Sequence, residues 1–144
     1  MASKTFAHDE LLFVPLGGTE EIGMNFNLYG YGPPNAHKWI IFDLGLTFGD
    51  DTNPSIDLIL PDPKFLCEGN KDILAIVLTH GHEDHIGAVP YLWEKLKCPI
   101  YATPFTASLL RSKLQFENLT DVVKINEIQL NGKFNLGPFS LELV

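Results

Sequence analysis

The chain has 144 residues, about one domain, of which 45% are hydrophobic and 19% charged. This composition excludes a disordered protein, and its apolar runs are too short to span a membrane. The net charge of −8 argues against a basic nucleic-acid footprint, so any action on RNA has to explain that deficit. The chain has two cysteines, Cys67 and Cys98, whose spacing does not suggest a disulfide framework. We therefore expect two buried thiols in a protein of the reducing cytoplasm.

The first third of the chain carries three strand patterns, over residues 11–16, 25–29 and 38–44. No helical pattern separates them, so we expect antiparallel pairing and a hairpin between the first two. Residues 46–63 have the composition of a loop. At its end, Asp62 and Pro63 predict the cap and first residue of a short helix that runs through Cys67.

The middle of the chain alternates strand and helix. The segment DILAIVLT (72–79) is apolar on both faces, which is typical of an internal strand in an α/β layer. Apolar residues at helical spacing predict a helix over 86–96, in which Pro90 fits only in the first turn. A short strand over 99–102 and a helix over 103–115 follow.

The tail, residues 122–144, has strand patterns divided by the turn dipeptides Asn131-Gly132 and Gly137-Pro138. Strands therefore come first, strand and helix then alternate, and strands return. This order predicts an α/β fold in which a mixed sheet carries helices on one face, rather than a doubly wound nucleotide-binding fold.

The segment LTHGHEDHIG (78–87) places four ligand-type residues directly after the buried strand. His80, His82, Asp84 and His85 form the pattern H-x-H-x-D-H. Alternate residues of an extended segment point the same way, so His80 and His82 can hold one ion, while Asp84 and His85 face a neighbouring site. Imidazole and carboxylate are suitable ligands for zinc and manganese. The alternative is a polar loop with Asp84 as a helix cap, but four such groups at this spacing favour metal.

This pattern resembles the signature of the metallo-β-lactamase superfamily, whose αββα fold holds two metals between two sheets. The resemblance implies that His80 and His82 bind the first metal and that Asp84 and His85 bind the second and act in catalysis. It also implies a metal-bound hydroxide as the nucleophile. FDLGL (42–46) resembles an upstream motif of these proteins, which implies that Asp43 supports the histidine loop through hydrogen bonds. The alternative for Asp43 is a turn former at a strand end.

The segments PLGGTEEIGMNFNLYGYG (15–32) and PIYATPFTASLL (99–110) narrow the resemblance to ribonuclease J, a group of β-CASP nucleases within the superfamily. With the histidine motif they cover nearly the whole chain. The resemblance implies an RNA hydrolase that cuts phosphodiesters internally or from the 5′ end with two metal ions, Zn²⁺ or Mn²⁺. Two other hypotheses are a thioesterase of the glyoxalase II type and a non-catalytic assembly module.

Proteins of this kind carry further metal ligands, and no histidine follows His85 in this sequence. The resemblance therefore implies that residues 1–144 are the amino-terminal half of an αββα domain, without the β-CASP insertion or the carboxy-terminal half. Two ligands per ion are fewer than a stable zinc site has, so we expect weak or no metal binding and little catalysis. One sheet face would lack its cover, which predicts self-association through that face.

Overall fold

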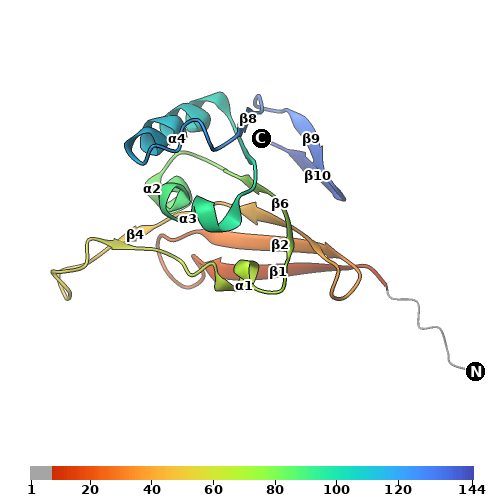
Figure 1. Cartoon of the computed structure of the whole chain (residues 1–144), viewed down its shortest axis with the longest axis horizontal. Coiled ribbons are helices and arrows are strands. Elements are labelled where there is room, and N and C mark those ends of the chain that lie inside the picture. Colours follow the sequence, from red (N-terminus) through yellow and green to blue (C-terminus); the bar gives the residue numbers. More distant parts are fainter. Residues whose placement is uncertain (1–7) are drawn as a thin grey trace, which may run out of the picture.

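A six-stranded mixed sheet in the order β1-β2-β3-β6-β7-β8 forms the centre of the computed structural model, which describes residues 8–144 (Figure 1). Its strands are β1 (Glu10–Gly17), β2 (Phe26–Gly32), β3 (Lys38–Phe42), β6 (Asp72–Val77), β7 (Ile100–Ala102) and β8 (Ile125–Glu127). The helices are α1 (Lys64–Cys67), α2 (Glu83–Ile86), α3 (Val89–Leu96) and α4 (Pro104–Phe116). Two small two-stranded sheets complete the chain: β4 (Thr47–Phe48) with β5 (Leu58–Ile59), and β9 (Lys133–Leu136) with β10 (Phe139–Glu142).

The strand directions follow from the connections. β1, β2 and β3 are joined without helices and pair antiparallel, as the sequence predicts. From β3 onward the sheet is parallel, through β6, β7 and β8. Parallel neighbours need long crossovers, and helical segments supply them between β6 and β7 and between β7 and β8. The predicted α/β fold with a mixed sheet is therefore confirmed.

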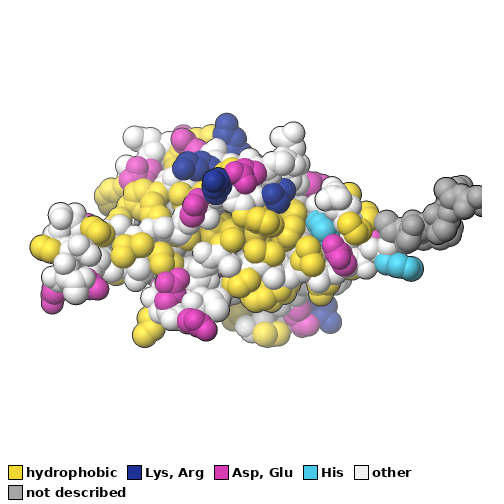
Figure 2. Space-filling view, turned by 90° about the horizontal axis from the view of Figure 1, so that it is seen from below, with side chains coloured by type: hydrophobic (Ala, Val, Ile, Leu, Met, Phe, Trp, Pro, Cys, Tyr) yellow, Lys and Arg dark blue, Asp and Glu magenta, His cyan; other side chains and the backbone are white. Residues whose placement is uncertain are grey.

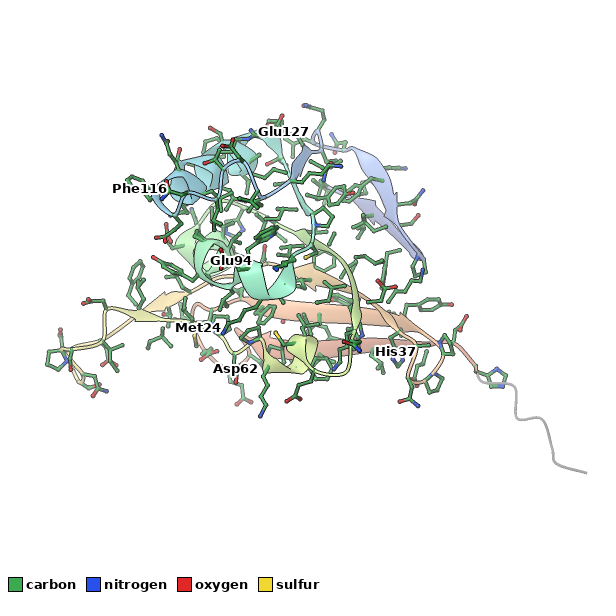
Figure 3. The ribbon with its side chains drawn as sticks, in the orientation of Figure 1. Met24, His37, Asp62, Glu94, Phe116 and Glu127 are labelled. Carbon is green, nitrogen blue, oxygen red and sulfur yellow. The ribbon has the colours of Figure 1, made fainter. Side chains whose placement is uncertain are left out.

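The main hydrophobic core lies between the sheet and the helices, whose side chains fill the space between the two layers (Figure 3). On the sheet side, Leu28, Ile41 and Ile76 are fully buried. On the helical side, Leu110 and Leu114 of α4 are equally buried. Because these side chains alternate with residues that point to the opposite face, they fix the register of the sheet and hence the positions of its strand ends.

The opposite face of the sheet is only partly covered. The β9–β10 hairpin, which turns at Gly137-Pro138, packs Leu136 against a patch that contains Ile40 and Val77. The expectation of a face without any cover was therefore wrong at its centre. At the edge strand β1 it holds, because the side chains of Leu11 and Phe13 are 63% and 55% exposed.

The predicted helix over 86–96 is two helices. α2 begins earlier, at Glu83, and α3 begins at Val89 with Pro90 in its first turn. The break lies at Gly87 because a proline ring clashes with a preceding helical turn and supplies no N–H. In the long loop, Asp62 Oδ1 accepts a hydrogen bond from Lys64 N at 2.9 Å. The N-cap of α1 is however Pro63 and the helix starts at Lys64, so the predicted cap and first residue each lie one position too early.

The two cysteines differ in environment. Cys98 is buried, and burial raises the pKa of its thiol to about 12. Cys67 is exposed, because its neighbour Leu66 is the residue of α1 that enters the core. The prediction of two buried thiols was therefore wrong for Cys67. Within residues 8–144, no helix combines the length and the apolar character needed to cross a bilayer.

Candidate metal centre

The histidine motif begins where β6 ends, at the carboxyl edge of the parallel part of the sheet. His80 lies in the loop after β6, and His82 is the extended residue immediately before α2. Asp84 and His85 then lie within α2. β6 is an internal strand hydrogen-bonded on both sides, so the motif starts from a rigid point. The carboxyl ends of parallel strands are the usual position of ligand sites in α/β folds.

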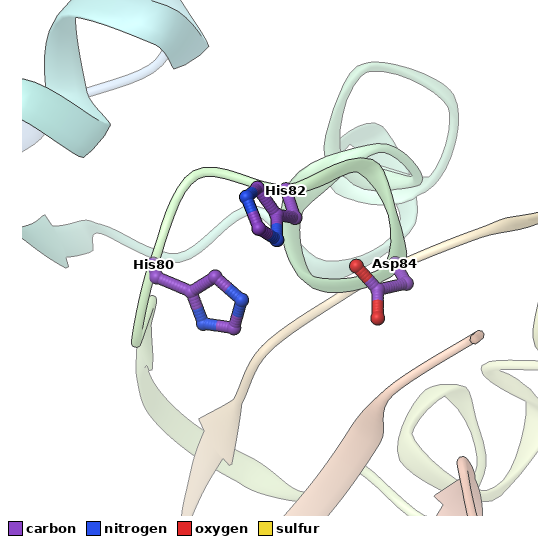
Figure 4. A group of neighbouring side chains, drawn as sticks. All are labelled: His80, His82 and Asp84. Carbon is purple, nitrogen blue, oxygen red and sulfur yellow. The ribbon is translucent and has the colours of Figure 1, made fainter. Parts of the chain in front are cut away.

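Three ligand-type side chains of the motif converge on one space. The side chains of His80, His82 and Asp84 turn toward one another (Figure 4), and each offers a ligand atom within 4.8 Å of the other two. A tetrahedral zinc holds its ligand atoms roughly 3.4 Å apart, so rotations that close the gap by roughly an ångström bring all three onto one ion. Two imidazoles and a carboxylate are a donor set that zinc and manganese accept.

His85 lies beside this cluster. Its Nε2 is 3.3 Å from Asp84 Oδ2, and its ring centroid is 3.7 Å from that of His80. The sequence pattern predicts Asp84 beside His85 and His82 beside His80. The structure places the Asp84 carboxylate next to both groups, so all four side chains surround one small region.

A buried carboxylate sets the orientation of these rings. Asp43 follows β3 and is 5% exposed. Its Oδ1 accepts a hydrogen bond from Thr79 N at 2.8 Å, and its Oδ2 accepts one from Thr79 Oγ1 at 2.7 Å. Asp43 Oδ2 is also 2.8 Å from His85 Nδ1. An ionised carboxylate only accepts, so the contact with Asp43 is a hydrogen bond donated by His85 Nδ1, and Nε2 is the ring nitrogen that faces Asp84 and the cluster.

Thr79 links Asp43 to a second histidine, His80. Its hydroxyl hydrogen is directed at Asp43, so its oxygen accepts from His80 Nδ1, which is 3.3 Å away. That leaves the His80 Nε2 lone pair without a proton and available to an ion. The hydrogen bonding that FDLGL led us to expect of Asp43 is thus present, and the metal roles of the four motif residues remain predictions.

The sequence family that matches residues 32–129 is described as the metallo-beta-lactamase superfamily, and the match covers more than half of the chain. The chain belongs to this superfamily. Curated relatives add detail. The chain is 48% identical, over 94% of its length, to ribonuclease J of Sinorhizobium meliloti. It is 35% identical, over 98%, to ribonuclease J 1 of Streptococcus pyogenes, and 34% identical, over 92%, to ribonuclease J of Thermus thermophilus. It spans about a quarter of the length of each.

Solved structures resemble the fold at lower identity. A crystal structure of a protein of unknown function from Enterococcus faecalis is similar with a TM-score of 0.59 and 21% identity, over 92% of this chain and 36% of that one. Zinc-bound PqqB from Methylobacterium extorquens is similar with a TM-score of 0.50 and 22% identity, over 77% and 38% of the two chains. At these identities the likeness concerns the fold.

The metallo-β-lactamase loop of this chain is also held through its backbone. For Asn25 the sequence left two roles open, a residue that orients the loops of the site and a strand-edge amide. Asn25 N and Asn25 Nδ2 both donate to Asp84 O, at 2.9 and 3.0 Å. Leu44 N donates to His85 O at 2.8 Å. Gly45 passes so close that a Cβ built on it would lie 1.7 Å from Asp84 O, so no larger residue fits without moving α2. The glycine of FDLGL, Gly45, was the available signal.

A second unforeseen contact fastens the loop to the helical layer. Glu83 of α2 forms an ion pair with Lys113 of α4. Partial burial lowers the pKa of the Lys113 ammonium. The two residues belong to separate helices with a strand between them, so no local pattern indicated the pair. Together with Asn25 and Gly45, it fixes α2 from both sides.

We expect Asp43→Asn to lower the free energy of unfolding by about 1–3 kcal/mol, because the carboxamide has an NH₂ group in place of one of the two oxygens that accept from Thr79 N, Thr79 Oγ1 and His85 Nδ1. Urea unfolding measures the change. Asp51→Asn, in the exposed loop before β5, is the matched control and should unfold like the unmodified chain. Equal stability of the two variants would show that the buried carboxylate does not hold the loop.

Proposed function

We propose that this chain supplies metal ligands to a metal-dependent RNA hydrolase of the ribonuclease J type. The observation that carries the proposal is the convergence of His80, His82, Asp84 and His85 at the end of β6, over a buried Asp43. The identity of 48% with a protein named ribonuclease J directs the proposal toward RNA.

In this proposal His80 and His82 bind one ion, Asp84 and His85 bind a second, and Zn²⁺ or Mn²⁺ suits the donors. Bound divalent ions would supply Lewis-acid activation of water and would neutralise charge on a phosphodiester. Asp43 keeps the His85 proton on Nδ1, away from the ion. The ions would also offset the net charge of −8, because they add positive charge at the place where the acidic chain must bind a phosphate.

Four ligand groups shared between two ions leave each with two, and gathered on one ion His80, His82 and Asp84 supply only the minimum of the three or four that stable zinc sites have. We therefore expect calorimetric titration of residues 1–144 with zinc to show weak, non-saturating binding at micromolar concentrations. Two tight sites per chain would contradict this expectation. The double variant His80→Ala, His82→Ala should remove the remaining heat, while His37→Ala, which changes a histidine paired with Glu10 far from the motif, should leave it unchanged.

A chimera tests the proposed activity. The matching 136-residue segment of Sinorhizobium meliloti ribonuclease J is replaced by this chain, and the product is assayed on 5′-monophosphorylated RNA. We expect hydrolysis, and a loss of at least about 100-fold with His80→Ala and His82→Ala, because the motif would hold the ions. Circular dichroism confirms folding of each version.

A folded chimera that leaves RNA intact would overturn the proposal. One that hydrolyses thioesters in place of RNA would favour the glyoxalase II-type alternative. Retention of full activity by the double histidine variant would show that the motif does not act through metal.

The exposed sheet edge supports a second proposal, that copies of the chain associate. Figure 2 views the molecule from the side on which β1 and α1 lie in Figure 1, and hydrophobic side chains form a broad band there. On the face opposite the helices, Leu11 and Phe13 line a cavity of about 450 Å³ with Phe139 and Leu141 of the hairpin. An apolar patch of this kind favours a symmetric contact between two copies.

Sedimentation velocity should therefore show a dimer or larger species whose proportion rises with concentration. Phe13→Glu should shift the distribution to monomer, because it places a charge in the apolar patch. Ile22→Glu, which alters an equally apolar but 95% exposed residue of the β1–β2 turn, should not. A single monomer at all concentrations would refute self-association.

A further inference from the structure

We propose that the pocket between the histidine loop and α4 is a nucleobase-binding subsite in which an unpaired base stacks on Phe105. The inference rests on the proposed RNA hydrolase function and assigns one part of the RNA to one part of the surface. The pocket has a volume of about 620 Å³. The lining residues are Thr79, His80, Gly81, His82, Thr103, Pro104, Phe105, Thr106, Leu109, Gln129 and Leu130.

The position of the pocket links it to the candidate metal centre. His80 and His82 form one of its walls, so a group inside it lies next to the place where a scissile phosphate would meet an ion. The first turn of α4 forms another wall. Gly81 lets the histidine loop pass close to α4, because a Cβ at that position would lie 2.4 Å from Leu109 Cδ1. The pocket is therefore bounded on one side by the histidine loop and on the other by α4.

The chemistry of the lining selects a base over a phosphate. Apart from the two histidines, the described residues around the pocket carry only apolar groups, two threonine hydroxyls beyond that of Thr79, and the amide of Gln129. The cations of α4 are engaged elsewhere, Arg111 with Glu127 at 2.6 Å and Lys113 with Glu83. A flat, uncharged ring with hydrogen-bonding groups on its edge matches such a surface, whereas a free phosphate finds no ammonium or guanidinium there.

Phe105 has the exposure that stacking requires. Its side chain is 72% exposed, although other apolar residues of the same helix, Ala107 and Leu110, are fully buried. Leu130 across the pocket is 66% exposed. An aromatic ring left in water beside a metal-ligand loop gains contact area when a base covers it, and such stacking strengthens binding by about tenfold or more per base. Gln129, which also lines the pocket, carries an amide that can bond the edge of a base.

A tryptophan probe tests the subsite in the chain itself. Trp39 and Trp93 are buried, so Phe105→Trp introduces an exposed indole whose emission is distinct. We expect adenosine 5′-monophosphate to quench it saturably. Ribose 5-phosphate, which has the same phosphate and sugar but no base, should have no effect. Phe116→Trp is the matched control, because Phe116 is 88% exposed at the far end of α4 (Figure 3), and we expect no saturable quenching there.

Three results would overturn the proposal. They are equal responses to the nucleotide and to ribose 5-phosphate, equal responses of the two tryptophan variants, and no response at all. Concentration-dependent shielding of the indole from acrylamide without nucleotide would assign the pocket to a second copy of the chain instead.

The chimera separates this inference from the proposed function. We expect Phe105→Ala to raise the KM for RNA about tenfold with little change in kcat. If the chimera with Phe105→Ala cleaves RNA with an unchanged KM, the proposed subsite is refuted and the proposed hydrolase function stands. If adenosine 5′-monophosphate quenches the Phe105→Trp variant but the chimera folds and does not cleave RNA, the subsite stands and the hydrolase function is refuted.

Discussion

The buried carboxylate of Asp43 is the interaction on which the candidate site depends. β3 and β6 are parallel neighbours, so their carboxyl ends meet at one edge of the sheet. There Asp43, from the end of β3, accepts hydrogen bonds from Thr79, which follows β6, and contacts His85 of α2. Sheet order therefore determines which residues become neighbours. One carboxylate then orients the imidazole of His85, because it accepts a hydrogen bond from Nδ1 and so leaves Nε2 facing the cluster.

Local patterns predicted much of this arrangement. The spacing of His80, His82, Asp84 and His85, directly after an apolar strand, identified the cluster because alternation along an extended chain and the following helical turn are local properties. The mixed sheet followed from the order of elements. The same reasoning left the role of Asn25 open and could not place Lys113 beside Glu83, because such pairs depend on how distant segments pack.

Two departures have local physical reasons. Pro90 divides a helix that the apolar periodicity predicts to be continuous. Periodicity indicates which face of a helix is buried, but it does not indicate where a backbone N–H is missing. β4 and β5 are two-residue strands within a segment of loop composition, too short for any alternation to appear. The sequence correctly predicted the turn of the β9–β10 hairpin at Gly137-Pro138. It could not predict that the hairpin packs over Ile40 and Val77, because that contact depends on tertiary packing.

The site also joins parts of the chain that are far apart in sequence: Asp43 and His85 are 42 residues apart, and Asn25 and Asp84 are 59. Loops of that length close only when the sheet forms, since their entropy must be overcome by packing. Binding of an ion to this cluster would consequently be coupled to acquisition of the native topology. Divalent cation occupancy would act as a folding ligand, and a partly folded chain would present its histidines without the geometry that makes them selective.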